Sequence, residues 1–248
     1  MKALVIAGGR VPDRALLPAA TFADVSLVVA ADAGASACGG LGVSPDLVIG
    51  DLDSVDPATL AALGAAGVPV EGFPAEKDES DLELALRAAI GRGATAIVVL
   101  GALGGTRIEH LLSAVDLLVV ASESGVELSL VDDRSEVRML SGGRPPLEIR
   151  GAAGDFVSLF AWAGAASGVT THGLRYPLRD EPLPVGPSRG LSNELAGPVG
   201  SVGCRSGRLL VVHTRRASLD EGGTVRGCRE ARGASAGPRP VGTEGVGG

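Results

Sequence analysis

The sequence predicts an α/β protein in which a mostly parallel N-terminal sheet with flanking helices precedes a smaller, all-β, sandwich-like domain. Short apolar runs alternate with helical patterns over the first 130 or so residues, as in βαβ proteins. Helical periodicity then stops near residue 134, where glycine and proline begin to separate short strand-like stretches. We therefore expect an α/β domain over residues 1–134 and a β-domain over residues 135–216.

The first domain contains a series of apolar runs that we interpret as buried strands. Nearly continuous apolar runs of this length are typical of a sheet that is covered on both faces. Helices are predicted between them, most clearly at 81–92, where apolar residues recur at helical spacing, and at 109–122. The predicted strands are 3–7, 27–31, 47–49, 96–100 and 126–131.

The second domain lacks a helical period. Its strand-like stretches are 135–140, 155–161 and 209–214, all short and bounded by turn residues. Residues 217–248 are rich in Gly, Arg, Ala and Pro and contain few bulky side chains. Such a segment buries too little surface to offset the entropy of ordering, so we expect this tail to be disordered.

Composition excludes several classes of protein. The net charge is −7 with no basic stripe before the tail, which argues against nucleic acid as the main partner. No apolar stretch reaches the roughly 18 to 20 residues that a membrane helix requires, so no membrane partner is expected. The three cysteines form no CxxC motif, which indicates a reducing compartment and predicts a cytoplasmic location.

Two aspartates directly follow the predicted strand at 47–49. Side chains two residues apart in extended backbone project to the same side, so we expect Asp51 and Asp53 to converge on one cation. Carboxylates at the carboxyl end of a parallel strand suit Mg²⁺, which prefers oxygen ligands together with substrate phosphates. A polar turn without any ligand is the alternative interpretation of this segment.

A second acidic run precedes the predicted helix at 81–92. Ser80 and Glu83 have the spacing of a capping box, which is a structural role. The helix dipole explains Asp78 and Asp81 only in part. Because a helix N-terminus also offers free N–H groups to phosphate, and Lys77 adds a point charge, the run is equally consistent with a ligand site.

A glycine-rich segment connects the predicted strand at 96–100 with the predicted helix at 109–122. Gly104 and Gly105 would let the backbone approach a ligand closely, and Arg107 would bind phosphate through two N–H groups. The Walker pattern is absent, and an isolated His110 is more often a packing or capping residue. Asp32 also follows a strand, so these side chains are expected at one edge of the sheet.

Six segments of the chain carry a combined signal. They are A-D-A-G at 31–34, P-D-L-V-I-G-D-L-D-S at 45–54, K-D-E-S-D-L-E-L-A-L at 77–86, G-A-L-G-G-T-R-I-E-H at 101–110, G-L-R-Y-P-L at 173–178 and L-S-N-E at 191–194. Taken together and in order, these segments resemble the thiamine pyrophosphokinase (thiamine diphosphokinase) family. The similarity extends over about residues 1 to 214, with Thr106 and Glu109 as departures from the family's usual G-G-R-x-D-H pattern.

The resemblance implies a homodimer in which the α/β domain binds ATP and Mg²⁺ and the β-domain helps to form a thiamine site at the dimer interface. It also implies roles for individual residues, in addition to the nucleotide or phosphate contacts considered above for Lys77, Gly104, Gly105 and His110. The metal and catalytic acids would be Asp51, Asp53 and Asp81, the nucleotide or phosphate contacts Asp32, Asp78 and Arg107, and the thiamine-side residues Ser192 and Asn193.

The activity implied is attack of the thiamine hydroxyl on the β-phosphorus of ATP, with AMP as the leaving group. Asp81 would be either a metal ligand or the proton acceptor. A ring contact to cationic thiamine is assigned to Tyr176 rather than to Trp162, which we expect to pack in the core. The alternatives are a pyrophosphokinase for a pterin alcohol, a metal-dependent phosphoesterase and a non-catalytic thiamine-binding module.

Overall fold

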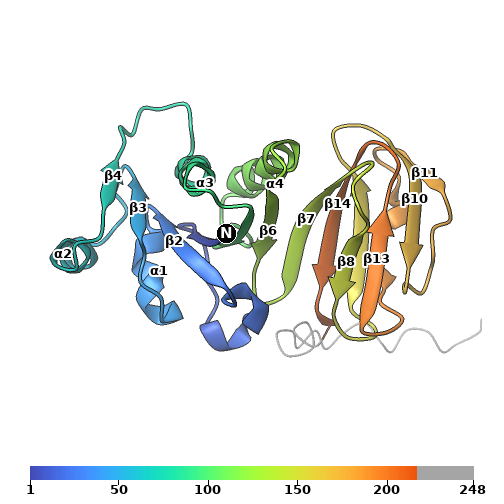
Figure 1. The fold of residues 1–248 in the computed structure, drawn as a ribbon, viewed down its shortest axis with the longest axis horizontal. Coiled ribbons are helices and arrows are strands. Elements are labelled where there is room, and N and C mark those ends of the chain that lie inside the picture. The colour runs from blue at the N-terminus through green and yellow to red at the C-terminus, as the bar shows by residue number, and fades with distance from the viewer. Residues whose placement is uncertain (217–248) are drawn as a thin grey trace, which may run out of the picture.

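The computed structural model describes residues 1–216, so the tail predicted to be disordered lies outside the described residues. A ten-stranded sheet runs through the described chain, in the order β12-β9-β14-β7-β6-β5-β1-β2-β3-β4. A second, four-stranded sheet covers one end of it (Figure 1). The chain is therefore α/β at one end and a β-sandwich at the other, which confirms the predicted fold class.

The α/β end contains six parallel strands in the order β6-β5-β1-β2-β3-β4. All of the predicted strands are present within a few residues of the predicted bounds. The exposed edge strand β4 was not predicted, because it has no apolar run. The strands are β1 (Lys2–Ile6), β2 (Val25–Ala31), β3 (Leu47–Gly50), β4 (Val70–Gly72), β5 (Ala96–Leu100) and β6 (Glu127–Val131).

Helices cover both faces of this sheet. The predicted α3 (Asp81–Gly91) and α4 (Ile108–Glu123) pack on one face, and α1 (Gly34–Leu41) and α2 (Pro57–Ala65) lie on the other side (Figure 1). Helices α1 and α2 were not predicted, because both are rich in Ala and Gly and lack a clear apolar stripe. Short 3₁₀ turns, η1 (Arg14–Leu16) and η2 (Ala19–Thr21), complete the β1–β2 connection.

Strand direction reverses after β6. Asp132 Oδ1 accepts hydrogen bonds from the backbone N–H groups of Arg134 and Ser135, which tightens the turn into antiparallel β7 (Ser135–Ser141). The large sheet continues through β14 (Arg208–Thr214), β9 (Phe156–Ala161) and β12 (Asn193–Glu194). The covering sheet contains β8 (Leu147–Arg150), β10 (Ala166–His172), β11 (Glu181–Leu183) and β13 (Val199–Gly203). One sheet thus crosses the expected boundary, and we propose residues 1–134 and 135–216 as two regions because strand direction changes there.

The sandwich encloses its own apolar core and one buried aspartate. Asp155 Oδ2 accepts hydrogen bonds from Ala152 N at 2.9 Å and pairs with His213 Nε2 at 3.1 Å, while Oδ1 accepts from Arg216 N at 2.9 Å. Burial by itself raises the pKa of Asp155, but these backbone donors and His213 outweigh burial and lower it. A Cβ on Gly151 would lie 2.5 Å from Asp155 Oδ2, so glycine is required there.

Helix α4 joins the two regions. Trp162 Nε1 donates to Asp116 Oδ1 at 3.2 Å, and Arg208 of β14 pairs with Glu123. Trp162 is partly buried against the α/β core, rather than in the core of the β-domain where it was expected to pack. Within residues 1–216, no helix combines the length and apolar character needed to cross a membrane.

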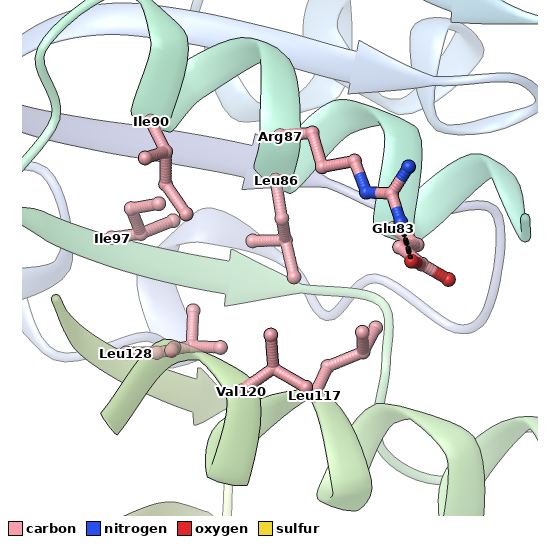
Figure 2. A pocket seen from close by; sticks show the side chains of 9 residues that line it. Glu83, Leu86, Arg87, Ile90, Ile97, Leu117, Val120 and Leu128 are labelled. Atoms are coloured by element: carbon pink, nitrogen blue, oxygen red, sulfur yellow. Dashed lines mark hydrogen bonds and ion pairs between the residues drawn. The ribbon is translucent and has the colours of Figure 1, made fainter. Parts of the chain in front are cut away.

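A small apolar groove of about 80 Å³ lies between α3 and α4. Leu86 and Ile90 of α3 face Leu117 and Val120 of α4 across it (Figure 2). The charged side chains at its rim, Glu83 and Arg87, neutralise each other at 2.7 Å. Without further polar groups, this groove offers no means for catalysis.

Candidate functional site

The strand order creates a crevice between β1 and β5. From β1 the chain builds outward through β2, β3 and β4, then returns to place β5 on the other side of β1. Loops that leave such a switch point diverge, and ligands of open α/β sheets bind there, outside the carboxyl ends of the strands. A cavity of about 640 Å³ opens at this position, lined by the loops after β1, β2 and β5 and by the starts of α3 and α4.

Glycines form the floor of this cavity. Gly9 N donates to Gly101 O at 3.1 Å, and a Cβ on Gly9 would lie 2.3 Å from that oxygen. Gly101 has a φ of 78°, and a Cβ there would lie 2.3 Å from Ala7 O. Both loops are therefore close together only because side chains are absent. Gly8 and Gly9 also line the cavity and were not predicted as site residues, although a Gly-Gly pair directly after the first predicted strand is a signal for such a site.

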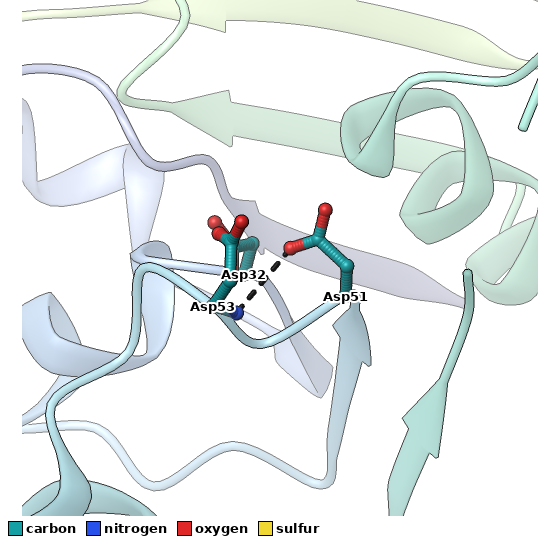
Figure 3. Close-up of side chains that lie close together, drawn as sticks. All are labelled: Asp32, Asp51 and Asp53. Atoms are coloured by element: carbon teal, nitrogen blue, oxygen red, sulfur yellow. Dashed lines mark hydrogen bonds between the residues drawn. The ribbon is translucent and has the colours of Figure 1, made fainter. Parts of the chain in front are cut away.

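Three aspartates meet beside the cavity. Asp32 follows β2, and Asp51 and Asp53 follow β3 (Figure 3). One carboxylate oxygen from each lies within 4.8 Å of the others. Asp32 and Asp51 are partly buried, whereas Asp53 is exposed. The predicted convergence of Asp51 and Asp53 is seen, together with Asp32, which the resemblance had placed on the nucleotide instead.

The geometric reason given for this convergence was wrong. Asp51 and Asp53 are not in extended backbone, because Leu52 between them has a φ of 64°, and Asp32 has a φ of 45°. A non-glycine residue in this left-handed region carries strain of about 1–3 kcal/mol and is often found at ligand sites. The tight turn at Leu52 brings the two carboxylates together, rather than the two-residue period of a strand.

A fourth carboxylate comes from the first residue of α3. Ser80 caps this helix by accepting a hydrogen bond from Glu83 N at 3.2 Å, as predicted, and so places Asp81 at the helix start. A Cβ on Gly50 would lie 3.2 Å from Asp81 Oδ1 and 3.0 Å from Asp32 Cβ. Glycine at position 50 thus allows both acidic side chains to lie against β3.

Lys77 provides a cation for this cluster. Its Nζ lies 3.1 Å from Asp81 Oδ1 and 3.8 Å from Asp51 Oδ2. Even so, Asp81 Oδ1 and Asp32 Oδ1 are buried and accept a well-aligned hydrogen bond from no residue in the described part of the chain. Buried acceptors without donors are costly unless a ligand satisfies them. A hard divalent cation fits this donor set, which consists of carboxylate oxygens alone.

Some of the other residues predicted to bind nucleotide line the cavity, and others do not. Gly105, Arg107 and His110 line the cavity and are exposed, while Gly104 forms the neighbouring turn with a φ of 74°. Arg107 Nε donates to Glu109 Oε1 at 2.6 Å, a hydrogen bond that lowers the pKa of Glu109. Asp78 is exposed and is not part of the cavity lining.

Of the thiamine-side residues, Asn193 begins β12, Ser192 directly precedes it, and Tyr176 lies in the loop before β11. Asn193 is buried: its Nδ2 donates to Tyr176 O at 2.7 Å, and its Oδ1 accepts from Tyr176 N and Glu194 N at 3.0 and 2.9 Å. Ser192 is exposed, with a φ of 57°. The Tyr176 ring is 52% exposed, and the guanidinium of Arg175 lies 5.4 Å from its centre.

These residues do not meet the acidic cluster within one chain. β12 is the first strand of the ten-stranded sheet and β3 is the ninth, so eight strand spacings separate them. At about 4.8 Å per spacing, the distance is about 38 Å. The two halves of the predicted site therefore lie toward opposite edges of the sheet (Figure 1).

Comparison with known proteins finds one family in both regions. The family model for "Thiamin pyrophosphokinase, catalytic domain" matches residues 19–130. The family model for "Thiamin pyrophosphokinase, vitamin B1 binding domain" matches residues 147–209. Together these matches include all four clustered aspartates and both Tyr176 and Asn193.

Individual relatives agree with the family models. The thiamine pyrophosphokinase of Bacillus subtilis (strain 168) is 26% identical over 173 residues, covering 70% of this chain and 80% of that protein. Its crystal structure superposes with a TM-score of 0.77 at 24% identity, covering 87% of this chain and 100% of the other. The enzyme from Geobacillus thermodenitrificans gives a TM-score of 0.73 at 28% identity, covering 88% and 99%. The chain therefore belongs to the thiamine pyrophosphokinase family.

Proposed function

We propose that this protein transfers the pyrophosphate group of ATP to thiamine, giving thiamine diphosphate and AMP. Family membership supports the reaction class. The observation that carries the proposal is the cluster of acidic side chains, with buried and unsatisfied oxygens, at the rim of a cavity of about 640 Å³. A cavity of that size lies in the range that small-molecule ligands occupy.

Magnesium is the proposed cofactor, held by Asp32, Asp51 and Asp53, with Asp81 next to them. When bound, the ion supplies positive charge that offsets the phosphate oxygens of ATP during transfer. Asp81 either completes this ligand set or accepts the proton of the thiamine hydroxyl. Loss of activity in Asp81→Asn fits both roles. If the fall in rate at low pH is present in wild type and absent from the residual activity of Asp81→Asn, Asp81 is the proton acceptor.

The phosphates of ATP are proposed to lie on the glycine floor. The starts of α3 and α4 line this region, and their helix dipoles favour anions there. Arg107 and His110 line the same cavity and add donors at its exposed side. The chain thus binds and orients the phosphates mainly through backbone, with charge added at the rim.

The thiamine side of the site is proposed to come from a second copy of the chain. Since about 38 Å separates β12 from β3 within one chain, a single chain cannot present Tyr176 and Ser192 to its own acidic cluster. A two-fold dimer would place the sandwich of each copy at the cluster of the other and produce two equivalent sites. We therefore propose a homodimer.

The cytoplasm is the proposed location. Cys38 and Cys204 are both buried and free, which agrees with a reducing compartment. Burial raises the pKa of the Cys38 thiol to about 11, so this thiol is unreactive at neutral pH. The absence of nucleic-acid and membrane partners stays a prediction from composition.

An AMP-release assay with ATP and Mg²⁺, with and without thiamine, tests the reaction. We expect AMP to form only when thiamine is present, with thiamine diphosphate in equal amount. AMP or phosphate release without any acceptor would instead identify a phosphoesterase, and release with a pterin alcohol alone would change the substrate. Binding of thiamine without turnover would indicate a binding module.

Subunit complementation tests the dimer. Asp51→Asn and Tyr176→Ala are each expected to impair both sites of their own dimer. Mixed dimers would contain one site in which both contributing halves are intact. With thiamine well below its KM, an equimolar mixture should therefore be more active than the mean of the two variants assayed separately. A mixture that forms mixed dimers but recovers nothing would refute a site shared between subunits.

A further inference from the structure

Lysine is rare in this chain. The 248 residues contain 22 Lys and Arg, of which Lys2 and Lys77 are the two lysines and the other 20 are arginines. A protein that otherwise uses arginine for its cations has a lysine beside its acidic cluster. An ammonium is a compact point charge, whereas a guanidinium is a wide planar group. The choice at position 77 therefore favours a small cation that fits among carboxylates.

The surroundings of Lys77 are those of a bound cation. Its Nζ lies 3.1 Å from Asp81 Oδ1 and 3.8 Å from Asp51 Oδ2, and it donates to Pro74 O at 3.2 Å. The side chain is 11% exposed, which is unusual for lysine. Three oxygens thus surround the ammonium within the cluster, away from solvent.

Asp51 is shared between the ammonium and the aspartate triad. Its Oδ2 faces Lys77, while its Oδ1 accepts a long hydrogen bond of 3.4 Å from Asp53 N (Figure 3). A divalent ion held by Asp32, Asp51 and Asp53 would therefore share Asp51 with the ammonium, so the two cations would repel each other. Four carboxylates with one lysine carry a formal charge of −3 rather than −4.

We propose that Lys77 is a built-in counter-cation that weakens the binding of free divalent metal and thereby couples metal loading to the nucleotide. The proposal rests on the function assigned above and adds an order of binding. When ATP enters, its phosphates offer Lys77 a second set of anionic oxygens, which relieves the repulsion between the ammonium and the metal. Metal therefore binds tightly only together with nucleotide.

A purely structural role for Lys77 makes a different prediction. If Lys77 only holds the loop before α3 in place, its removal should loosen the cluster and weaken metal binding. If it acts as a competing cation, its removal should strengthen metal binding in the absence of nucleotide. The sign of the change separates the two roles, and Lys77→Arg shows whether charge is the cause.

The experiment measures Mn²⁺ binding to the full-length protein without nucleotide, by titration calorimetry or by electron paramagnetic resonance of the free ion. We expect Lys77→Met to lower the dissociation constant for Mn²⁺ about tenfold, because an ammonium paired with Asp51 and Asp81 repels a divalent ion held by the same cluster. Lys77→Arg keeps the charge but is wider than an ammonium, so its dissociation constant for Mn²⁺ should lie between those of wild type and Lys77→Met. Arg87→Met on α3 is the matched control, because Arg87 pairs with Glu79 and Glu83, outside the cluster.

A non-hydrolysable ATP analogue supplies the second measurement. It should increase Mn²⁺ affinity strongly in wild type and much less in Lys77→Met. If wild type binds Mn²⁺ and Lys77→Met binds it no more tightly, the role proposed for Lys77 is wrong, although the metal site stands. The same holds if Arg87→Met increases the affinity for Mn²⁺ as much as Lys77→Met does. Failure of every variant to bind Mn²⁺, with or without the analogue, would overturn the proposed metal site as well.

Discussion

The acidic rim, made up of Asp32, Asp51, Asp53 and Asp81, can be compared with the Ser192–Asn193 segment at the start of β12. The two differ in whether the chain itself supplies hydrogen-bond partners to their polar atoms. At the rim, Asp32 Oδ1 is buried without a hydrogen-bond donor among the described residues, and buried Asp81 Oδ1 has only the ion pair with Lys77 Nζ at 3.1 Å. On β12, the amide of Asn193 makes three hydrogen bonds to the chain itself. Both segments match one family, yet only the rim keeps unsatisfied acceptors for a ligand.

Family motifs therefore combine residues that bind ligand with residues that hold the fold. Asn193 fixes the backbone around Tyr176 and so presents that ring, although its own side chain is not available to substrate. Ser192 differs from its neighbour, because it is exposed and shares the positive φ seen at Asp32 and Leu52. Of these two predicted thiamine-side residues, only Ser192 is exposed to solvent.

The largest expected effect is that of Asp51→Asn. Removal of one of the clustered carboxylates should reduce kcat/KM at least about 1,000-fold, a loss typical of charge stabilisation at a reacting centre. Thermal stability should stay the same or increase, because repulsion among the aspartates decreases. The AMP-release assay and thermal unfolding measure the two effects.

Asp46→Asn is the matched control for that prediction. Asp46 lies just before β3, where its Oδ2 accepts a hydrogen bond from Val28 N at 2.8 Å. Its replacement should lower stability by about 1 kcal/mol and leave kcat/KM close to wild type. Equal losses of activity in both variants would remove the distinction between rim and scaffold.

Asn193→Ala should show the opposite behaviour to Asp51→Asn. Loss of its buried hydrogen bonds leaves the N–H and C=O groups of Tyr176 unpaired, so the free energy of unfolding should fall by about 2–3 kcal/mol. Urea unfolding measures this change. Ser192→Ala, in contrast, should change stability by less than about 0.5 kcal/mol, since Ser192 is exposed. A stable Asn193→Ala protein would contradict the assigned role.

Substitutions at Tyr176 test whether the sandwich provides an aromatic ring that contacts thiamine. Tyr176→Ala should raise KM for thiamine about fivefold, the effect expected when a cation loses an exposed aromatic face. Tyr176→Phe keeps the ring and should match wild type. If both variants leave KM unchanged, the proposed contact between Tyr176 and thiamine is wrong.

The smallest expected effect concerns Asp155, an aspartate whose partners are all supplied by the chain. Because its pKa is lowered in the folded state, its stabilising contribution is complete above the unfolded-state pKa of about 3.9 and is lost as pH falls toward the lower folded value. Unfolding measured between about pH 5 and pH 2 should show this loss. In Asp155→Asn the same pH range should have less influence, while the protein is less stable at pH 7.

Sequence reasoning succeeded where the signal was local. Apolar runs predicted the buried strands, and Ser80 was identified as a helix cap three residues before Glu83. The aspartates after β3 were recognised because a strand runs directly into them. Gly9 was missed because its importance depends on Gly101, which is distant in sequence but within hydrogen-bond distance in the fold.

The sequence alone determined the α/β and all-β regions, the strand ends that bear acidic residues and the family, since all of these depend on short-range patterns. Only the tertiary structure decided that one sheet spans both regions, that Asp32 joins Asp51 and Asp53, and that Asn193 serves the fold. Strand order and the partners of each polar side chain depend on contacts between distant segments. No local pattern records such contacts, because they form only when the whole chain packs.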